Sequence, residues 1–548
     1  MKRTWNIDAL RPTPAVRRFA LNALLLIGAN LFMRTVGVSF NAYLAGQAGA
    51  EVMGLYSLLF GVYGLALTLG SAGINLGTTR LVAEVMGTSC PAGAKEVDAN
   101  CRRSILCVMR RCIFYSLVCS IATGLLLFLG APFVGKVWLG DARTVLSLRV
   151  LALTLPPIAV SACLGGYFTA VRRIGKSAAV GIGMQFIRIG ACAYLLRLWL
   201  PQGVEMTCLS LVLGGALSEF CGLFLTVIAY LWDRRQHLAV QNNSHPIHTE
   251  IVTPGEKTIV RRLLDITVPV TLASCLRSGL LTLQHILIPR GLKKSGASWA
   301  SALASYGVLH SMVLPVVLFP SAFISSFSGL LVPEVAESCA RGDRARVARL
   351  ADRIITPALI FSFGVAGIMA AFGHELGEAI YGAGNQEAGL YIRILAPLIP
   401  IMYVDSSVDA FLKGMGEQVY SMNVNIIDAL ASVILVWLLL PRMGLTGYIV
   451  AIFVTETLNT TLSLCRMLRL SNMPVRLYRQ VFGPLVCILG ATCLCRLGGV
   501  VFGLGVTGTW SLIWHIAICA GLYGALLMFA GVVRLPRSVR PQKSNITI

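Results

Sequence analysis

The sequence predicts an all-α membrane protein that crosses the bilayer about fourteen times. Hydrophobic residues make up 56% of the 548 residues and charged residues only 13%, whereas soluble domains carry about 25% charged residues. The mean hydropathy is +0.76. Apolar runs of about 20 residues, the length that spans a bilayer, recur along the chain. Strict alternation is absent from these runs, so helices are favoured over a closed barrel.

The predicted spans follow one another with short polar connections. They cover residues 19–41, 52–76, 112–133, 147–171, 177–199, 206–231, 266–289, 300–331, 354–373, 391–412, 419–440, 445–465, 481–500 and 511–533. The basic start before the first run resembles a signal peptide. That run contains Asn30 and Arg34 and many more spans follow it, so we interpret it as an uncleaved first helix.

The net charge of +22 follows the positive-inside pattern, because the basic residues concentrate in alternate loops. We therefore expect a multi-pass protein of the plasma membrane with both termini in the cytoplasm. Nucleic acid is not an expected partner, since no basic helix or aromatic-basic motif lies outside those loops. One basic turn breaks the pattern on the predicted outer side, at Arg290, Lys293 and Lys294. A contact with outer-leaflet phospholipid or with an emerging anionic headgroup would explain it.

Weak internal similarity predicts two pseudo-symmetric six-helix lobes followed by two further helices. Arg34 lies in the first span of one half and Arg277 in the first span of the other, and the hairpins end in RLVAE and PEVAE. Paired halves around a site at mid-membrane are a recurring plan of secondary transporters. The predicted parts are an N-terminal lobe (1–232), a cytoplasmic linker (233–265), a C-terminal lobe (266–470), and two helices with a basic cytoplasmic tail (471–548).

Three predicted spans each carry an arginine near mid-depth. A charged group there costs about 2.5–3.5 kcal/mol, so it should face protein or water. The guanidinium fork matches phosphate, which predicts an anionic headgroup site at Arg34, Arg188 and Arg277. Other polar residues expected in the same cavity are Asn30, Asn41, Glu219, Gln284, Asp405 and Asp409. The alternative is that each arginine is neutralised by a neighbouring helix and serves packing.

Acidic and amide side chains also lie on three predicted spans, one of which carries Arg277. Asp265 opens the seventh span, Asn425 and Asp428 share a face of the eleventh, and Glu456 lies on the twelfth. Such oxygens suit a monovalent cation or a titrating proton. An internal salt-bridge network with the arginines is the alternative.

The sequence contains no motif of an enzyme. Walker, His-Glu-x-x-His, Gly-x-Ser-x-Gly and CxxC patterns are all missing from the sequence, so we expect neither catalysis, nor a cofactor, nor a structural metal site. Coupling to Na⁺ or H⁺ stays open.

Two stretches carry a family resemblance. ITVPVTLASCLRSGLLTLQHILIPRGLKKSG, with the following ASYGVLHSMVLPVVLFPSAFISSFSGLLVPEVAE, resembles the stage V sporulation protein B group of polysaccharide-synthesis-type transporters. RTVGVSFNAYLAGQAGAEVMGLYSLLFGVYGLALTLGSAGI and PLIPIMYVDSSVDAFLKGMGEQVYSMNVNIIDA resemble the same group. The superfamily also contains lipid II flippases and multidrug and toxin extrusion exporters.

The resemblance implies alternating access and export of a lipid-pyrophosphate-linked saccharide, a peptidoglycan or polysaccharide precursor for the cell envelope. Arg34 and Arg277 are similar to arginines that engage pyrophosphate in the lipid II flippase branch. That branch also has a sodium site, to which Asp265, Asn425, Asp428 and Thr455 are similar in placement but not in spacing. The alternative function is a cation-coupled exporter of organic cations. The expected partners are the lipid-linked saccharide and membrane lipids. A monomer is expected, and association with envelope-synthesis enzymes stays open.

Overall fold

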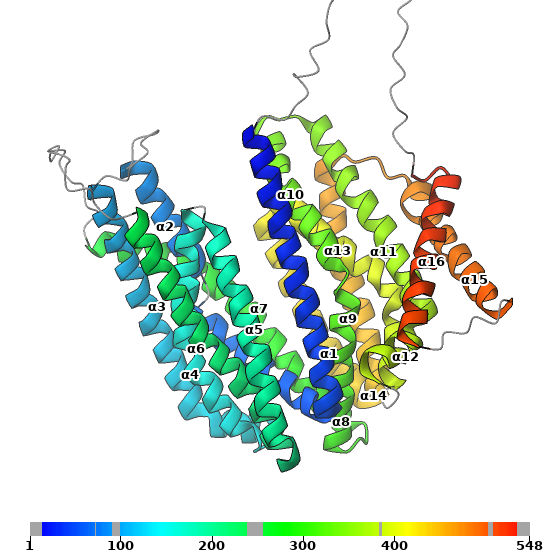
Figure 1. Ribbon diagram of the computed structural model, residues 1–548, viewed down its shortest axis with the longest axis horizontal. Coiled ribbons are helices and arrows are strands. Elements are labelled where there is room, and N and C mark those ends of the chain that lie inside the picture. The colour runs from blue at the N-terminus through cyan, green and yellow to red at the C-terminus, as the bar shows by residue number, and fades with distance from the viewer. Residues whose placement is uncertain are drawn as a thin grey trace, which may run out of the picture. The chain divides into compact units, whose positions relative to one another are not determined.

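The computed structural model of the chain describes residues 14–71, 73–89, 99–171, 173–237, 256–382, 386–501 and 508–533, in which helices and turns but no strand occur (Figure 1). The prediction of an all-α fold is confirmed. Most of the linker that was expected at 233–265 and the basic tail after Val533 lie outside the described residues.

The described residues contain twelve helical segments that are long and apolar enough to cross a membrane. Two of them, Leu31–Met86 and Gln418–Ser471, each overlap two of the predicted spans, so every one of the fourteen predicted spans overlaps one of the twelve segments. The predicted span 19–41 starts before Leu31, and the predicted span 300–331 extends past the segment Trp299–Leu318. The count of about fourteen is therefore approximate, and the difference arises where two spans join without a loop.

Glycines mark both joints. Helix α1 (Pro14–Ser71) is kinked at Gly49, with φ 81° and ψ 166°, and α14 (Gln418–Ser471) is kinked at Gly444, with φ 59° and ψ −138°. These backbone angles are open to glycine and costly for other residues. Each kink separates two spans while the helix stays continuous in sequence.

The chain forms two compact units. Unit 1 comprises the described residues up to Gly307 together with Ala429–Tyr448, and unit 2 comprises Val308–Asp428 and the described residues after Tyr448. Unit 1 thus includes α7, α8 and the middle of α14, which the predicted lobes place in the C-terminal half. The pseudo-symmetric lobes stay a prediction.

In unit 1, α1 is followed by a set of neighbouring helices. Their bounds are α2 (Ile74–Ser89), α3 (Ala99–Phe133), η2 (Val134–Leu139), α4 (Thr144–Ala170), α5 (Ile174–Trp199), η3 (Leu200–Gln202), α6 (Val204–His237), α7 (Glu256–Lys294) and α8 (Trp299–Gly307). Helix α4 packs against α3 and α6, and α6 packs against α5 (Figure 1). A core of side chains from α2, α3, α4, α6 and α7 joins them, with Val82, Cys163 and Phe168 fully buried.

Small residues bring α1 and α8 into backbone contact. A Cβ on Gly54 would lie 2.0 Å from the carbonyl oxygen of Leu303, and one on Gly307 would lie 2.2 Å from that of Ala50. Only glycine permits this approach, which is the way helices without a hydrophobic driving force pack in membranes.

Unit 2 starts inside the eighth predicted span. Its helices are η4 (Val308–Val313), α9 (Leu314–Leu318), α10 (Ser321–Ala340), α11 (Arg344–Tyr381), α12 (Gln386–Leu395), η6 (Ala396–Leu398), α13 (Ile399–Gly414), the outer parts of α14, η7 (Tyr478–Phe482), α15 (Gly483–Val501) and α16 (Thr509–Phe529). A turn at Phe319 and Pro320 separates α9 from α10, as expected of proline. One core joins α10, α11, α13 and α14, and another joins α15 and α16 to α11.

Candidate functional site

All three predicted headgroup arginines belong to unit 1. Arg188 lies on α5 near the midpoint of the candidate span Gly175–Gln202, and Arg277 on α7 near the midpoint of Arg261–Lys294. Arg34 lies on the first arm of α1. Because α1 packs against both α5 and α7, the three helices that carry the arginines are neighbours within one unit.

Arg188 is held among aromatic side chains of α1. Its Nη2 donates a hydrogen bond of 2.8 Å to the phenol oxygen of Tyr56, and it interacts electrostatically with Glu219 on α6. The Tyr56 ring lies 4.5 Å from that of Phe60, centroid to centroid. The partner that Arg188 bonds is neutral, so the guanidinium keeps donors for a further ligand.

Arg277 lies on α7, which is joined to α1 by two hydrogen bonds of neighbouring residues. Thr282 donates to the carbonyl oxygen of Gly61 at 2.8 Å, and Thr68 donates to Ser278 at 3.3 Å. Arg277 itself is exposed, and among the described residues it has no hydrogen-bond or ion-pair partner. The alternative that a neighbouring helix neutralises it finds no support in the described part of the chain.

The remaining residues that were predicted for this cavity have different surroundings. Arg34 is exposed and Asn41 half-buried, and each has an interaction with another residue. Gln284 is half-buried on α7, about two turns after Arg277. The side chain of Asn30 lies outside the described side chains.

Three carboxylates come together in unit 2. Glu456 on the second arm of α14 interacts electrostatically with Asp428 on the first arm and with Asp405 on α13. Thr455 beside it is buried, and its hydroxyl donates to the carbonyl oxygen of Ile452 at 3.3 Å. Three interacting carboxylates concentrate negative charge, which attracts a cation or a proton.

Asn459 adds an oxygen near this cluster. It lies one turn beyond Glu456 on α14 and is 7% exposed, and its Oδ1 has no hydrogen-bond partner in the structure. In the described part of the chain, however, no three His, Cys, Asp or Glu side chains are grouped closely enough to hold a metal ion.

The other residues predicted for the ion site or the cavity have local partners or belong to the other unit. Asp409 accepts from Lys413 at 2.6 Å and from Ser421, so it belongs to a local salt bridge. Asn425 donates to the carbonyl oxygen of Ser421 at 2.8 Å. Asp265 is exposed on α7 of unit 1, whereas the other members of the predicted ion site belong to unit 2. The ion site that was predicted from these residues stays a prediction.

Unit 1 also contains a buried aspartate that the sequence did not single out. The Asp233 side chain is fully buried and accepts hydrogen bonds from Tyr167 at 2.9 Å, from Lys176 at 2.8 Å and from Arg173. In the sequence, Arg173 and Lys176 fit the positive-inside pattern of the turn after the fourth span. The presence of Asp233 at the end of the sixth span was the signal that could have predicted an ion pair with this turn.

Two residues of the basic turn at Arg290, Lys293 and Lys294 contact other residues of unit 1. Arg290 donates to the carbonyl oxygen of Val137, and the Lys293 ammonium lies 5.9 Å from the centroid of the Trp299 ring. These contacts tie the end of α7 to η2 and to the start of α8. Packing within unit 1 accounts for these two cations without a lipid ligand.

Comparison with known proteins adds family relationships. The model of a family described as polysaccharide biosynthesis protein matches residues 19–339. Stage V sporulation protein B of Bacillus subtilis (strain 168) is 23% identical over 522 residues, which cover 95% of this chain and 97% of the relative. Sporulation protein YkvU of the same organism is 20% identical over 463 residues, which cover 83% of this chain and 97% of that protein.

Solved structures with a similar fold are membrane transporters. The lipid II flippase MurJ in an inward closed conformation superposes with a TM-score of 0.65 and 12% identity, covering 92% of this chain and 98% of that one. An inward-facing multidrug resistance transporter of the MATE family, in the MOP superfamily, gives a TM-score of 0.59 at 13% identity, covering 81% and 96%. At these identities the likeness shows the fold alone.

Proposed function

The chain belongs to the polysaccharide biosynthesis protein family, and from this premise we propose that it is a flippase for a lipid-linked saccharide precursor of the cell envelope. It would move the precursor across the plasma membrane by alternating access. Its relatives carry names of sporulation proteins, and the fold is that of MOP-superfamily transporters. No catalytic role is proposed.

The observation that carries the proposal is the surplus of positive charge at mid-span in unit 1. Arg277 has no partner among the described residues, and Arg188 bonds a neutral phenol. A bare guanidinium at that depth costs about 2.5–3.5 kcal/mol. A ligand that brings negative charge to this depth offsets the cost. The pyrophosphate of a lipid carrier has this charge, and two of its oxygens can bind the planar guanidinium fork.

Replacing Arg277 tests this role. Arg277→Ala in reconstituted vesicles should abolish flipping of a fluorescent lipid-pyrophosphate saccharide, because the phosphate loses a charge-assisted pair of hydrogen bonds. Arg277→Lys should restore part of the rate, since charge returns without the planar fork. Arg261→Ala is the matched control, because it removes the same charge from the exposed start of α7. Flipping by Arg277→Ala at the wild-type rate would refute the phosphate role.

A second candidate function rests on the carboxylates of unit 2. An exporter of organic cations driven by Na⁺ or H⁺ would use Asp405, Asp428 and Glu456 to bind cations, and it would fit the MATE neighbours. Dye efflux from cells that lack their own pumps separates the two functions, because a dedicated lipid flippase gives none. Complementation of a conditional lipid II flippase mutant is the converse test.

A further inference from the structure

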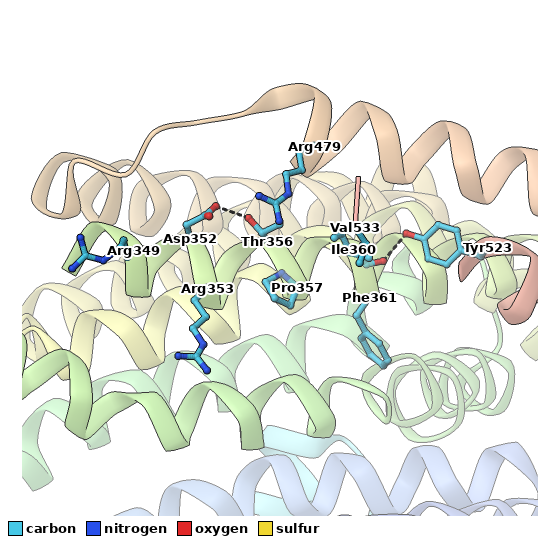
Figure 2. Close-up of a pocket in the computed structure, with 10 residues that line it drawn as sticks. All are labelled: Arg349, Asp352, Arg353, Thr356, Pro357, Ile360, Phe361, Arg479, Tyr523 and Val533. Atoms are coloured by element: carbon cyan, nitrogen blue, oxygen red, sulfur yellow. Dashed lines mark hydrogen bonds between the residues drawn. The ribbon is translucent and has the colours of Figure 1, made fainter. Parts of the chain in front are cut away.

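A pocket in unit 2 lies outside the site described above. Residues of α11, of η7 and of the end of α16 line its volume of about 600 Å³ (Figure 2). Arg349 and Arg353 come from the first turns of α11, and Arg479 extends from η7 toward Thr356 on α11 (Figure 2). The proposed transport cycle uses none of these side chains.

The three guanidinium groups keep most of their donors. Arg349 and Arg353 have no hydrogen-bond or ion-pair partner among the described residues. Arg479 donates only through Nε, to the carbonyl oxygen of Val532 at 3.1 Å, which leaves its terminal nitrogens available. Nearby on α11, Arg346 is paired with Glu334 at 3.1 Å.

The acid of the pocket does not neutralise them. Asp352 accepts from Thr356 at 2.7 Å and from the Nε2 of Gln480 at 3.2 Å, and Gln480 is itself 3% exposed. Gln480 also accepts from the backbone nitrogen of Arg476 at 3.1 Å. This network fixes η7 on α11 and directs the carboxylate to uncharged donors, so the pocket keeps a net positive charge.

Along α11 the lining changes from cationic to apolar. Arg349, Arg353, Pro357 and Phe361 follow one another at intervals of four residues, which places them on one face of the helix. Tyr523 of α16 lies beyond the arginines, where its hydroxyl donates to the carbonyl oxygen of Ile360 at 2.7 Å. This order, with cationic side chains first and apolar side chains after them, matches a phospholipid whose phosphate lies at the membrane boundary and whose acyl chains lie deeper.

The apolar part of α11 begins after the two arginines, because the span predicted from the sequence covers residues 354–373. The candidate span Arg344–Tyr381 has 38 residues, about 57 Å at about 1.5 Å per residue, whereas the hydrocarbon core is about 30 Å thick. We therefore place the turns that carry Arg349 and Arg353 in the headgroup region. Basic pockets between helices at this depth bind anionic lipid headgroups.

We propose that this pocket is a binding site for one anionic phospholipid, whose headgroup lies among Arg349, Arg353 and Arg479 and whose acyl chains pack against Phe361 and Tyr523. The bound lipid would join α11 to η7 and α16. The proposal is independent of the transported substrate.

Native mass spectrometry of the full chain with added phosphatidylglycerol tests the site. Wild type should retain one phosphatidylglycerol, and its thermal midpoint should rise. Each of Arg349→Gln, Arg353→Gln and Arg479→Gln should weaken binding about fivefold, the value for one basic residue near an anionic surface. Arg344→Gln removes the same charge from α11 outside the pocket and should leave binding within about twofold.

Further ligands separate a lipid from a free phosphate. Phosphatidylcholine should not substitute, because its headgroup is neutral overall, and neither glycerol phosphate nor inorganic phosphate should raise the thermal midpoint, because they lack chains. If Arg344→Gln weakens phosphatidylglycerol binding as much as the pocket variants do, the binding depends on general surface charge, and the proposal is wrong. Stabilisation by inorganic phosphate alone would assign the pocket to a soluble anion, and the lipid assignment would be wrong.

Discussion

Asp141 shows how one residue outside the spans can link three elements of unit 1. Its carboxylate accepts from Arg143, with Nη2 at 2.7 Å, and from the indole of Trp299 at 3.1 Å. Arg143 in turn pairs with Glu51, just after the kink of α1, at 3.2 Å. Burial raises the pKa of Asp141, but the hydrogen bonds from Arg143 and Trp299 outweigh burial, so its pKa lies below the usual value.

The sign of this shift predicts a pH dependence at the residue scale. A carboxylate with a lowered folded pKa contributes stability above its unfolded pKa of about 3.9, and the contribution is lost as the pH falls through the folded pKa. Wild type should therefore unfold at a higher temperature than Asp141→Asn at neutral pH, and the gap should narrow toward acidic pH. Thermal midpoints of both proteins across a pH series measure it. A gap that stays constant with pH would contradict the assignment.

At the scale of the element, the two kinked helices depend on glycine at one position each. Gly49 has φ 81° and ψ 166°, and a Cβ there would meet no atom within 4 Å. The cost of a side chain is therefore backbone strain and not collision. Gly49→Ala should destabilise unit 1 by about 1–3 kcal/mol, measured as a lower thermal midpoint in detergent.

Gly46 provides the matched control within the same helix. It is helical, and a Cβ there also meets no atom within 4 Å. Gly46→Ala should be neutral or stabilising by up to about 1 kcal/mol, because alanine has the higher helix propensity. If both variants lose the same stability, the kink conformation is not what glycine provides at position 49.

At the scale of the whole molecule, sequence reasoning succeeded where hydropathy decides the structure. The apolar runs predicted every span, because lipid leaves the backbone no choice but helix. The sequence does not show that two pairs of spans join through a helix kinked at glycine, since a glycine between apolar runs is equally compatible with a loop. The pairing of Arg188 with Tyr56, 132 residues away in sequence, depends on tertiary packing that no local pattern encodes.

The location of charge in the two units suggests that they do different work in transport. The three mid-span arginines belong to unit 1, whereas Asp405, Asp428 and Glu456 belong to unit 2. If unit 1 binds the anionic headgroup and unit 2 takes up the driving ion, single substitutions should separate the two properties. Glu456→Gln should remove the dependence of flipping on an imposed Na⁺ or H⁺ gradient and leave headgroup binding intact, because it deletes one titratable group and no arginine.

Arg277→Ala should lose headgroup binding in an assay with a soluble pyrophosphate-linked sugar, and flipping should be lost with it. Gradient-dependent flipping in vesicles and ligand-induced thermal shift measure the two properties on the same preparations. Glu387→Gln is the control, because Glu387 is an exposed acid of unit 2 on α12 and its replacement should change neither. Loss of headgroup binding in Glu456→Gln would mean that binding and coupling share one set of residues, and the division between the units would be wrong.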